Sequence, residues 1–295
     1  MHLVSKCIYS LCKVLIPLSS IGNMYISEFS NHRIRKVTAS SGVITTIAGT
    51  GQEGYSGDGG QATAALISYP VGINVDSAKN VYFGVSYVVR KVDVSTGIIT
   101  TVAGSGDIGY NGDNIQATAA SLSFPHDVVL DSDGNLYISD YSGNRIRKVD
   151  VSTGIITTVV GTGEASSTGD GSDASLATVN VPCFSRFDSG GNFYISECDG
   201  NRVRIITNLV AASPTSTPTV YTSVAPHPTL APRSFGKIST VAGSDLINGD
   251  GGNATSAFFT TPVGIAVDSL GIKLHGHLFI TLLMSNSFYR QRVHS

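Results

Sequence analysis

Four aspartates in glycine-rich loops are the residues whose type and spacing first suggest a chemical role. Each stands in a Gly-Asp-Gly or Gly-Asp-Asn triplet: Asp58, Asp113, Asp170 and Asp250. Carboxylates in such loops suggest calcium, but calcium takes six or more oxygen ligands, and one aspartate per copy is too few. We therefore expect these aspartates to cap their own turns, with the glycines supplying positive φ angles.

The adjacent residues His126 and Asp127 combine an imidazole with a carboxylate, the usual partners in metal sites and in acid–base catalysis. One histidine beside one aspartate supplies only part of either kind of site. The pair leaves two hypotheses open. The two residues could belong to a site that binds a divalent metal, or to a binding surface that catalyses no reaction.

The four cysteines contain no Cys-x-x-Cys motif, which argues against a zinc or redox site. They are Cys7, Cys12, Cys183 and Cys198. A two-residue turn at Gly190-Gly191 would pair Ser189 with Asn192 and place Cys183 opposite Cys198. A cross-strand disulfide is therefore geometrically open in an oxidising compartment, and two adjacent free thiols are the alternative.

The loop aspartates belong to a cassette that recurs along the chain. A proline follows each of them: Pro70, Pro125, Pro182 and Pro262. Both series advance by the same steps, 55, 57 and 80 residues. A fixed period of this size indicates a repeat architecture.

The clearest copy, residues 125–161, divides into four short strands bounded by turn residues. The predicted strands are 126–131, 136–139, 145–149 and 155–160, with a type I′ turn at Asp133-Gly134. Four antiparallel strands followed by a long loop are typical of one blade of a β-propeller. We also expect a short helical turn in the alanine-rich part of each loop, at 62–66 and 117–122.

A single blade cannot cover both of its apolar faces, so neighbouring blades must stack around a ring. We predict an all-β fold, a β-propeller of four-stranded antiparallel blades. About five repeats are recognisable, which is consistent with a five-bladed ring or with an incomplete six-bladed ring.

The recurring string resembles the NHL-repeat family of β-propellers. It is carried by residues 70–76 (PVGINVD), 134–140 (GNLYISD) and 31–37 (NHRIRKV). The resemblance covers roughly residues 21–293 apart from one insertion. The Ala-Gly and Gly-Asp-Gly loops between blades are similar to those of large secreted or receptor-borne NHL propellers. This resemblance favours an extracellular or receptor-borne location over a cytoplasmic one.

Residues that recur in every copy are more typical of the ring than of one reaction. We therefore assign structural roles to the loop aspartates and to one arginine of each third strand. These arginines are Arg35, Arg90, Arg147 and Arg204. Presentation of the aligned arginines to an anionic partner is the alternative.

The copies differ just after each proline, where the first strand of a propeller blade lines the central channel. The residues there are Val71-Gly72, His126-Asp127, Cys183-Phe184 and Val263-Gly264. We predict that His126, Asp127 and Cys183 contribute to binding at the channel mouth, without catalytic residues or a cofactor. The alternative is a metal-dependent lyase or lactone hydrolase at the same place, because related propellers carry such activities.

Composition narrows the function classes. Only 14% of the residues are charged and the net charge is −2, so the chain lacks the basic footprint of a nucleic-acid-binding protein. An RNA-binding NHL propeller remains a second alternative that would need stacking aromatics on a basic face. No apolar run approaches the roughly 20 residues of a transmembrane helix. The leading hypothesis is a monomeric, non-catalytic scaffold for a protein or glycan partner.

Three boundaries complete the predicted organisation. Residues 1–20 form a degenerate first strand or a weak signal segment, and residues 21–295 form the propeller. Residues 208–235 are a Pro/Ser/Thr-rich insertion in the fourth blade, and their composition predicts a flexible loop. The repeat pattern weakens after Gly271, as in an incomplete gene product.

Overall fold

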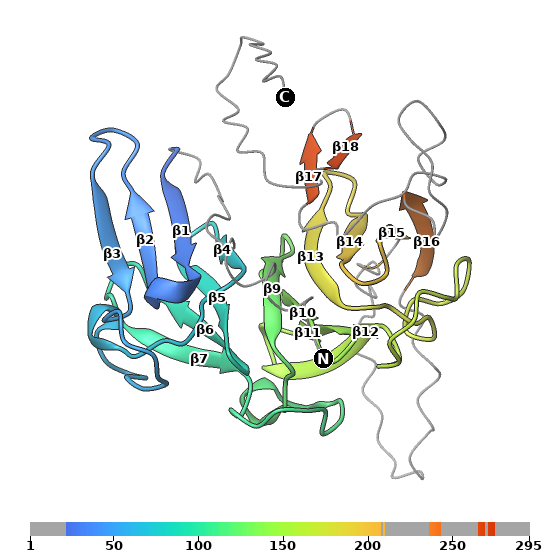
Figure 1. Cartoon of the computed structure of the whole chain (residues 1–295), viewed down its shortest axis with the longest axis horizontal. Coiled ribbons are helices and arrows are strands. Elements are labelled where there is room, and N and C mark those ends of the chain that lie inside the picture. Colours follow the sequence, from blue (N-terminus) through green and yellow to red (C-terminus); the bar gives the residue numbers. More distant parts are fainter. Residues whose placement is uncertain (1–21, 208, 210–235, 243–264, 269–270, 275–295) are drawn as a thin grey trace, which may run out of the picture.

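The computed structural model describes residues 22–207, 209, 236–242, 265–268 and 271–274 (Figure 1). Within these ranges the chain forms short antiparallel strands and three 3-10 turns. The predicted all-β fold with four-stranded sheets is confirmed. No helix in the described ranges has the length and apolar character needed to cross a membrane.

Successive repeats form successive blades, which follow one another in an arc (Figure 1). Blade 1 contains β1 (Met24–Glu28), β2 (Arg33–Val37) and β3 (Ile44–Ala48). Blade 2 contains β4 (Ile73–Val75), β5 (Val81–Val85), β6 (Val88–Val92) and β7 (Ile99–Ala103).

Blade 3 contains β9 (Pro125–Leu130), β10 (Leu136–Asp140), β11 (Arg145–Val149) and β12 (Ile155–Val160). Blade 4 contains β13 (Pro182–Phe187), β14 (Phe193–Glu197), β15 (Arg202–Thr207) and β16 (Lys237–Ala242). The strands β17 (Ile265–Asp268) and β18 (Gly271–Leu274) pair as a two-stranded sheet.

The turn between the first two strands of blade 3 differs from the predicted type I′ turn. Among its residues only Gly134 has a positive φ, 85°, whereas type I′ requires positive φ at two positions. The Asp131 carboxylate accepts hydrogen bonds from the backbone N–H groups of Asp133 and Asn135, 3.0 and 2.9 Å. This side chain organises a longer turn that pairs Asp131 with Asn135.

The hydrophobic core lies between the blades, as stacking of incomplete units requires. Three clusters of buried side chains each draw on two neighbouring blades. They bring together Tyr25 and Phe83, Val89 and Ile138, and Tyr137 and Phe193. Blades 1 to 4 therefore pack against one another through these three shared clusters.

The loops that connect the blades cover the outer strand edges. The short strand β8 (Ile115–Gln116) pairs with β12, and Gln61 forms an equivalent bridge to Ile98 beside β7. The expected helical turns are present as 3-10 turns directly after these residues, at η2 (Ala62–Ala64) and η3 (Ala117–Ala119). Each loop thus protects the edge of the blade that it precedes before entering that blade's inner strand.

Parts of the predicted organisation lie outside the described residues. These are the segment 1–20, the insertion 208–235 apart from Leu209, and Asp250 with its loop.

Candidate functional site

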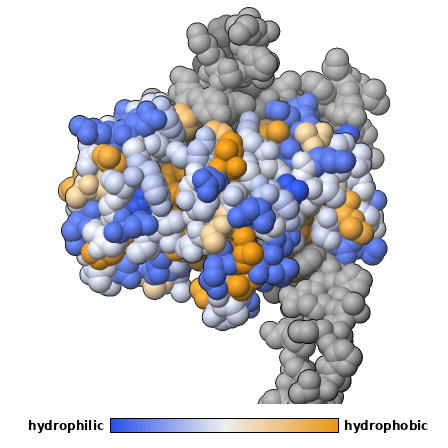
Figure 2. Space-filling view, turned by 90° about the horizontal axis from the view of Figure 1, so that it is seen from below, coloured by the Kyte–Doolittle hydropathy of each residue, from blue (hydrophilic) through white to orange (hydrophobic). Residues whose placement is uncertain are grey.

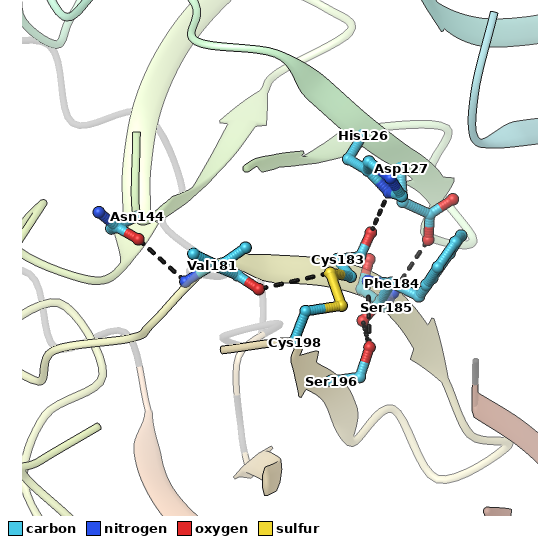
Figure 3. The surroundings of a disulfide bond; sticks show 9 residues. All are labelled: His126, Asp127, Asn144, Val181, Cys183, Phe184, Ser185, Ser196 and Cys198. Atoms are coloured by element: carbon cyan, nitrogen blue, oxygen red, sulfur yellow. Dashed lines mark hydrogen bonds between the residues drawn. A yellow bond between two sulfur atoms is a disulfide. The ribbon is translucent and has the colours of Figure 1, made fainter. Parts of the chain in front are cut away.

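The inner ends of β9 and β13 bring together the three residues predicted for the channel mouth (Figure 3). Asp127 is fully buried. Its Oδ2 atom accepts the backbone N–H of Ser185 and a guanidinium N–H of Arg186, both at 2.9 Å. The carboxylate therefore forms an ion pair between blades 3 and 4.

His126 is half-buried and is also held by blade 4. Its Nδ1–H donates to the carbonyl oxygen of Cys183 at 3.1 Å. The imidazole stacks on Tyr141, with 5.1 Å between ring centroids, and meets the edge of Phe184. Burial lowers the pKa of His126, and the imidazole is therefore neutral near pH 7.

The structure does not direct His126 and Asp127 toward a shared reacting atom. His126 binds Cys183, and Asp127 binds Ser185 and Arg186, so these contacts join the blades. Within the described ranges, no group of three or more His, Cys, Asp or Glu side chains is arranged to hold a metal ion. The divalent metal of the alternative hypothesis therefore has no ligand set in this part of the chain.

Arg186 is the site residue that sequence analysis missed. It occupies the position that is Asn74 in blade 2 and Val129 in blade 3. A cation at a position that is otherwise uncharged was the available signal. Its partner could not be predicted, because Asp127 lies on a different blade.

A disulfide joins Cys183 to Cys198, with 5.9 Å between the Cα atoms (Figure 3). The register differs from the one expected. The turn pairs Asp188 with Asn192, and a β-bulge lies between Pro182 and Phe184. The bulge moves the register one residue further, so Cys198 faces Val181 and Cys183 is the extra residue of the bulge. The disulfide therefore joins a bulged residue to the neighbouring strand, not a directly opposed pair.

The loop aspartates and the third-strand arginines form one interaction. Asp58 pairs with Arg90 at 2.6 Å, Asp113 with Arg147 at 3.1 Å, and Asp170 with Arg204 at 2.6 Å. The guanidinium groups are fully buried, whereas the carboxylates are partly exposed. Instead of capping only its own turn, each described aspartate ties its loop to the blade that follows.

Tyrosines of two loops complete these pairs. The guanidinium of Arg90 lies 5.0 Å from the ring centre of Tyr55, and that of Arg147 lies 4.9 Å from that of Tyr110. A cation over an aromatic face is favourable, particularly when desolvated. The fully buried side chains of Arg90, Arg147 and Arg204 are therefore engaged within the fold.

Blades 1 and 4 vary this arrangement. In blade 4, Arg204 also pairs with the fully buried Glu197 at 3.0 Å. In blade 1, Arg35 lies 3.6 Å from Glu28 on the neighbouring strand. Glu28 and Glu197 occupy the same position, the last residue of the second strand, where blade 2 has Val85. The recurrence predicted a common structural role, but the second carboxylate is not present in every copy.

Asp140 holds a buried carboxyl group at the end of β10. Its Oδ1 accepts the backbone N–H of Ser123 at 2.5 Å. Burial raises its pKa from 3.8 to about 6, although this hydrogen bond and nearby arginines oppose the shift. Protonation of Asp140 is thus favoured in the folded state.

We expect this group to make the protein more stable as the pH falls from about 7 to about 4. Asp140 takes up its proton near pH 6 in the folded protein and near pH 4 in the unfolded chain. This difference in pKa corresponds to a gain of about 3 kcal/mol in the free energy of unfolding. Urea unfolding across this pH range should show that the Asp140→Asn variant lacks this pH-dependent gain in the free energy of unfolding. Parallel pH profiles of the two proteins would contradict the assignment.

Aromatic rings gather where the interblade loops enter the inner strands. We call this set the aromatic collar: Phe29, Tyr69, Tyr87, Phe124, His126 and Tyr141. Phe29 contacts Tyr69 at 4.9 Å and Tyr87 contacts Phe124 at 5.0 Å between centroids. Both contacts join the second turn of one blade to the entry of the next. Tyr69 and Phe124 are each 39% exposed, so the collar faces solvent.

Strained backbone conformations hold part of the collar in place. Tyr69, Phe124 and Val181 each precede an inner-strand proline and have φ angles of 49°, 59° and 55°. Bulky residues rarely adopt this left-handed conformation. The backbone N–H of Tyr69 donates to His32 Nδ1, and that of Val181 to Asn144 Oδ1 (Figure 3). The preceding blade thus holds these two positions.

Comparisons with known proteins agree with this geometry. The family model of the teneurin NHL domain matches residues 49–111 and 106–182. Teneurin-3 of Danio rerio is 34% identical over 137 residues, and Teneurin-4 of Mus musculus is 31% identical over 142 residues. The alignments cover 40% and 42% of this chain and 5% of each teneurin, so the match spans a small part of those relatives.

A solved gluconolactonase from Xanthomonas campestris is similar in fold. The TM-score is 0.51, over 86% of this chain and 65% of that one. The two sequences are 12% identical, and the likeness therefore concerns the fold alone. The described sheets are blades of a β-propeller. The chain is an NHL-repeat propeller protein, and over residues 49–182 it is similar to the teneurin NHL domain.

Proposed function

We propose that this propeller is a non-catalytic interaction scaffold that binds a protein or glycan partner through its interblade loops and the aromatic collar. The main support is the distribution of exposed apolar groups. Six of the ten large apolar side chains that the described residues expose lie in these loops: Tyr55, Tyr69, Ile108, Tyr110, Phe124 and Leu176. Figure 2 shows hydrophobic patches among hydrophilic residues on one face of the molecule.

The interactions of the variable residues also support a binding role. Asp127 is engaged by Arg186 and Ser185, and His126 donates to the Cys183 carbonyl. The Asp127 carboxylate is fully buried and ion-paired, which opposes a role as a general base for a substrate. These contacts join the blades beneath the collar.

The location that fits this function is extracellular or receptor-borne. The Cys183–Cys198 disulfide requires an oxidising compartment for its formation and persistence. Exposed aromatic groups on a rigid, disulfide-linked scaffold suit recognition outside the cell, where such groups meet proteins and glycans.

The test combines binding with metal analysis. The purified protein is applied to panels of extracellular protein domains and glycans, alongside the double variant Tyr69→Ala/Phe124→Ala. The matched control is Val94→Ala/Val151→Ala, which removes exposed apolar groups from turns at the opposite ends of the blades. We expect the collar variant to lose about tenfold or more in affinity and the control to bind normally. Stoichiometric zinc, calcium or iron that is lost on His126→Ala would overturn the non-catalytic assignment.

A further inference from the structure

The aromatic collar is a solvent-facing surface maintained at a conformational cost. Three equivalent residues before inner-strand prolines adopt positive φ, and two of them carry half-exposed aromatic rings. Backbone strain of this kind is concentrated at ligand-binding and switch regions. At two successive blade junctions, the residue with positive φ is an aromatic one in contact with a second ring, Tyr69 with Phe29 and Phe124 with Tyr87.

We propose that the aromatic collar binds the proline-rich segment 211–233 of a second copy of this chain. This inference rests on the proposed interaction function and names its partner. Each molecule then offers both a collar and a proline-rich segment.

The segment has the composition that an aromatic surface recognises. Its prolines are Pro214, Pro218, Pro226, Pro228 and Pro232. Proline fixes φ near −65° and favours the extended polyproline II conformation, so little entropy is lost on binding. Such peptides dock in grooves lined with aromatic rings. Residues 211–232 contain no Asp, Glu, Lys or Arg, and burying this stretch therefore desolvates no charged side chain.

The topology of blade 4 favours a second copy over the same molecule. Thr207 at the end of β15 pairs with Lys237 at the start of β16, so the segment leaves and returns at one place. Strand directions alternate within a blade. This place therefore lies at the opposite end of the blade from the second turn, where the collar residues Phe29, Tyr87 and Tyr141 stand.

The length of the segment is sufficient for contact between molecules. Residues 208–236 connect the paired residues Thr207 and Lys237, so at most about half of their number sets the reach. At about 3.1 Å per residue the outward reach is roughly 40 Å, and a strand of the length seen here covers roughly 17–20 Å. A segment that extends from one end of the molecule can thus reach the collar of a copy stacked against that end.

The resulting contact is head to tail. Two different surfaces meet, so each added copy leaves a free collar and a free segment. We expect self-association that increases with concentration and stops at no fixed oligomer size.

Two complementary variants test the proposal by sedimentation velocity on the full chain. The collar variant is Tyr69→Ala/Phe124→Ala, and the segment variant replaces the five prolines with alanine. Each variant alone is expected to associate at least about tenfold more weakly than the unmodified chain. Mixed together, they should form a dimer that grows no further, because only one collar and one segment remain functional.

A peptide of residues 211–233 provides a second measurement. It should dissociate the assembly, whereas the same peptide with alanine in place of proline should not. A midpoint of thermal unfolding equal to that of the wild type would establish that both variants remain folded. The control variant Val94→Ala/Val151→Ala should self-associate as the wild type does.

The proposal is overturned if the chain does not self-associate, or if the proline-to-alanine peptide competes equally. It is also overturned if the mixed variants associate no better than either one alone. A foreign partner or glycan that binds through the collar in these circumstances would preserve the proposed interaction function. Loss of both self-association and collar-dependent foreign binding would overturn the two together.

Discussion

Replacing Arg204 with leucine is expected to lower the free energy of unfolding by about 3–5 kcal/mol at neutral pH. The fully buried guanidinium pairs with Glu197 at 3.0 Å and with Asp170 at 2.6 Å. Glu197 is itself fully buried. Removing Arg204 leaves this carboxylate without its counter-charge in a region of low polarity, which is far more unfavourable than losing a surface pair.

The loss should depend on pH. Burial raises the pKa of Glu197, and the charge of Arg204 opposes that rise. Without Arg204 the pKa in the folded state increases further, so the carboxyl group takes up a proton at a higher pH than in the wild type. The penalty is present above this pKa and disappears as the pH falls through it, because a neutral carboxyl group needs no counter-charge. Urea unfolding at several pH values measures both effects.

Arg90→Leu is the matched control. Arg90 is equally buried and pairs with a loop aspartate in the same way, but Val85 stands where blade 4 has Glu197. Within the part of the chain that the structure describes, the carboxylate that loses its partner is that of Asp58, which is 44% exposed. We expect a smaller loss that changes little with pH. Equal losses in the two variants, or a pH-independent loss in Arg204→Leu, would refute the role given to Glu197.

Removing the disulfide with Cys183→Ala/Cys198→Ala should lower the free energy of unfolding by about 3 kcal/mol. The bond closes a loop with a sequence separation of 15, and such a constraint mainly reduces the freedom of the unfolded chain. Alanine avoids placing a hydroxyl group among the apolar neighbours of these buried residues. Urea unfolding of the oxidised protein and of the variant gives the difference.

Dithiothreitol provides the control for the disulfide prediction. It should reduce the stability of the wild-type protein to about the level of the double variant and should leave the variant unchanged. A wild-type protein that is unaffected after complete reduction would show that the crosslink contributes little to stability.

The strands could be predicted because their signals are local. In blade 3, the third and fourth strands begin and end where alternation and turn residues place them, at Arg145–Val149 and Ile155–Val160. The helical turns in the loops could be predicted from local alanine-rich composition, and the stacking of blades could be predicted from the repeat. The predicted type of the turn after β9 was wrong, because hydrogen bonds to the Asp131 side chain outweighed the preference of the Asp-Gly pair for type I′.

The interaction partners of the site residues depend on contacts between blades. His126, Asp127 and Cys183 could be placed together because the repeat aligns the inner strands. The partner of Asp127 could not, since Arg186 lies 59 residues away along the chain. The loop aspartates likewise look like turn caps until the following blade places an arginine beside them.

The collar shows the same division. Tyr69 and Phe124 recur one repeat apart, each before an inner-strand proline, but the sequence does not show which rings they contact. The positive φ of Tyr69 and Phe124 arises at blade junctions, with a hydrogen bond to His32 in the case of Tyr69.

Periodic residues alone specify an NHL-repeat propeller, because strand, turn and stacking preferences act over short distances and are repeated in each copy. The partners of charged and aromatic groups required the folded structure. Those partners come from neighbouring blades, and a register shift or bulge of a single residue, as at Cys183, changes which side chains meet.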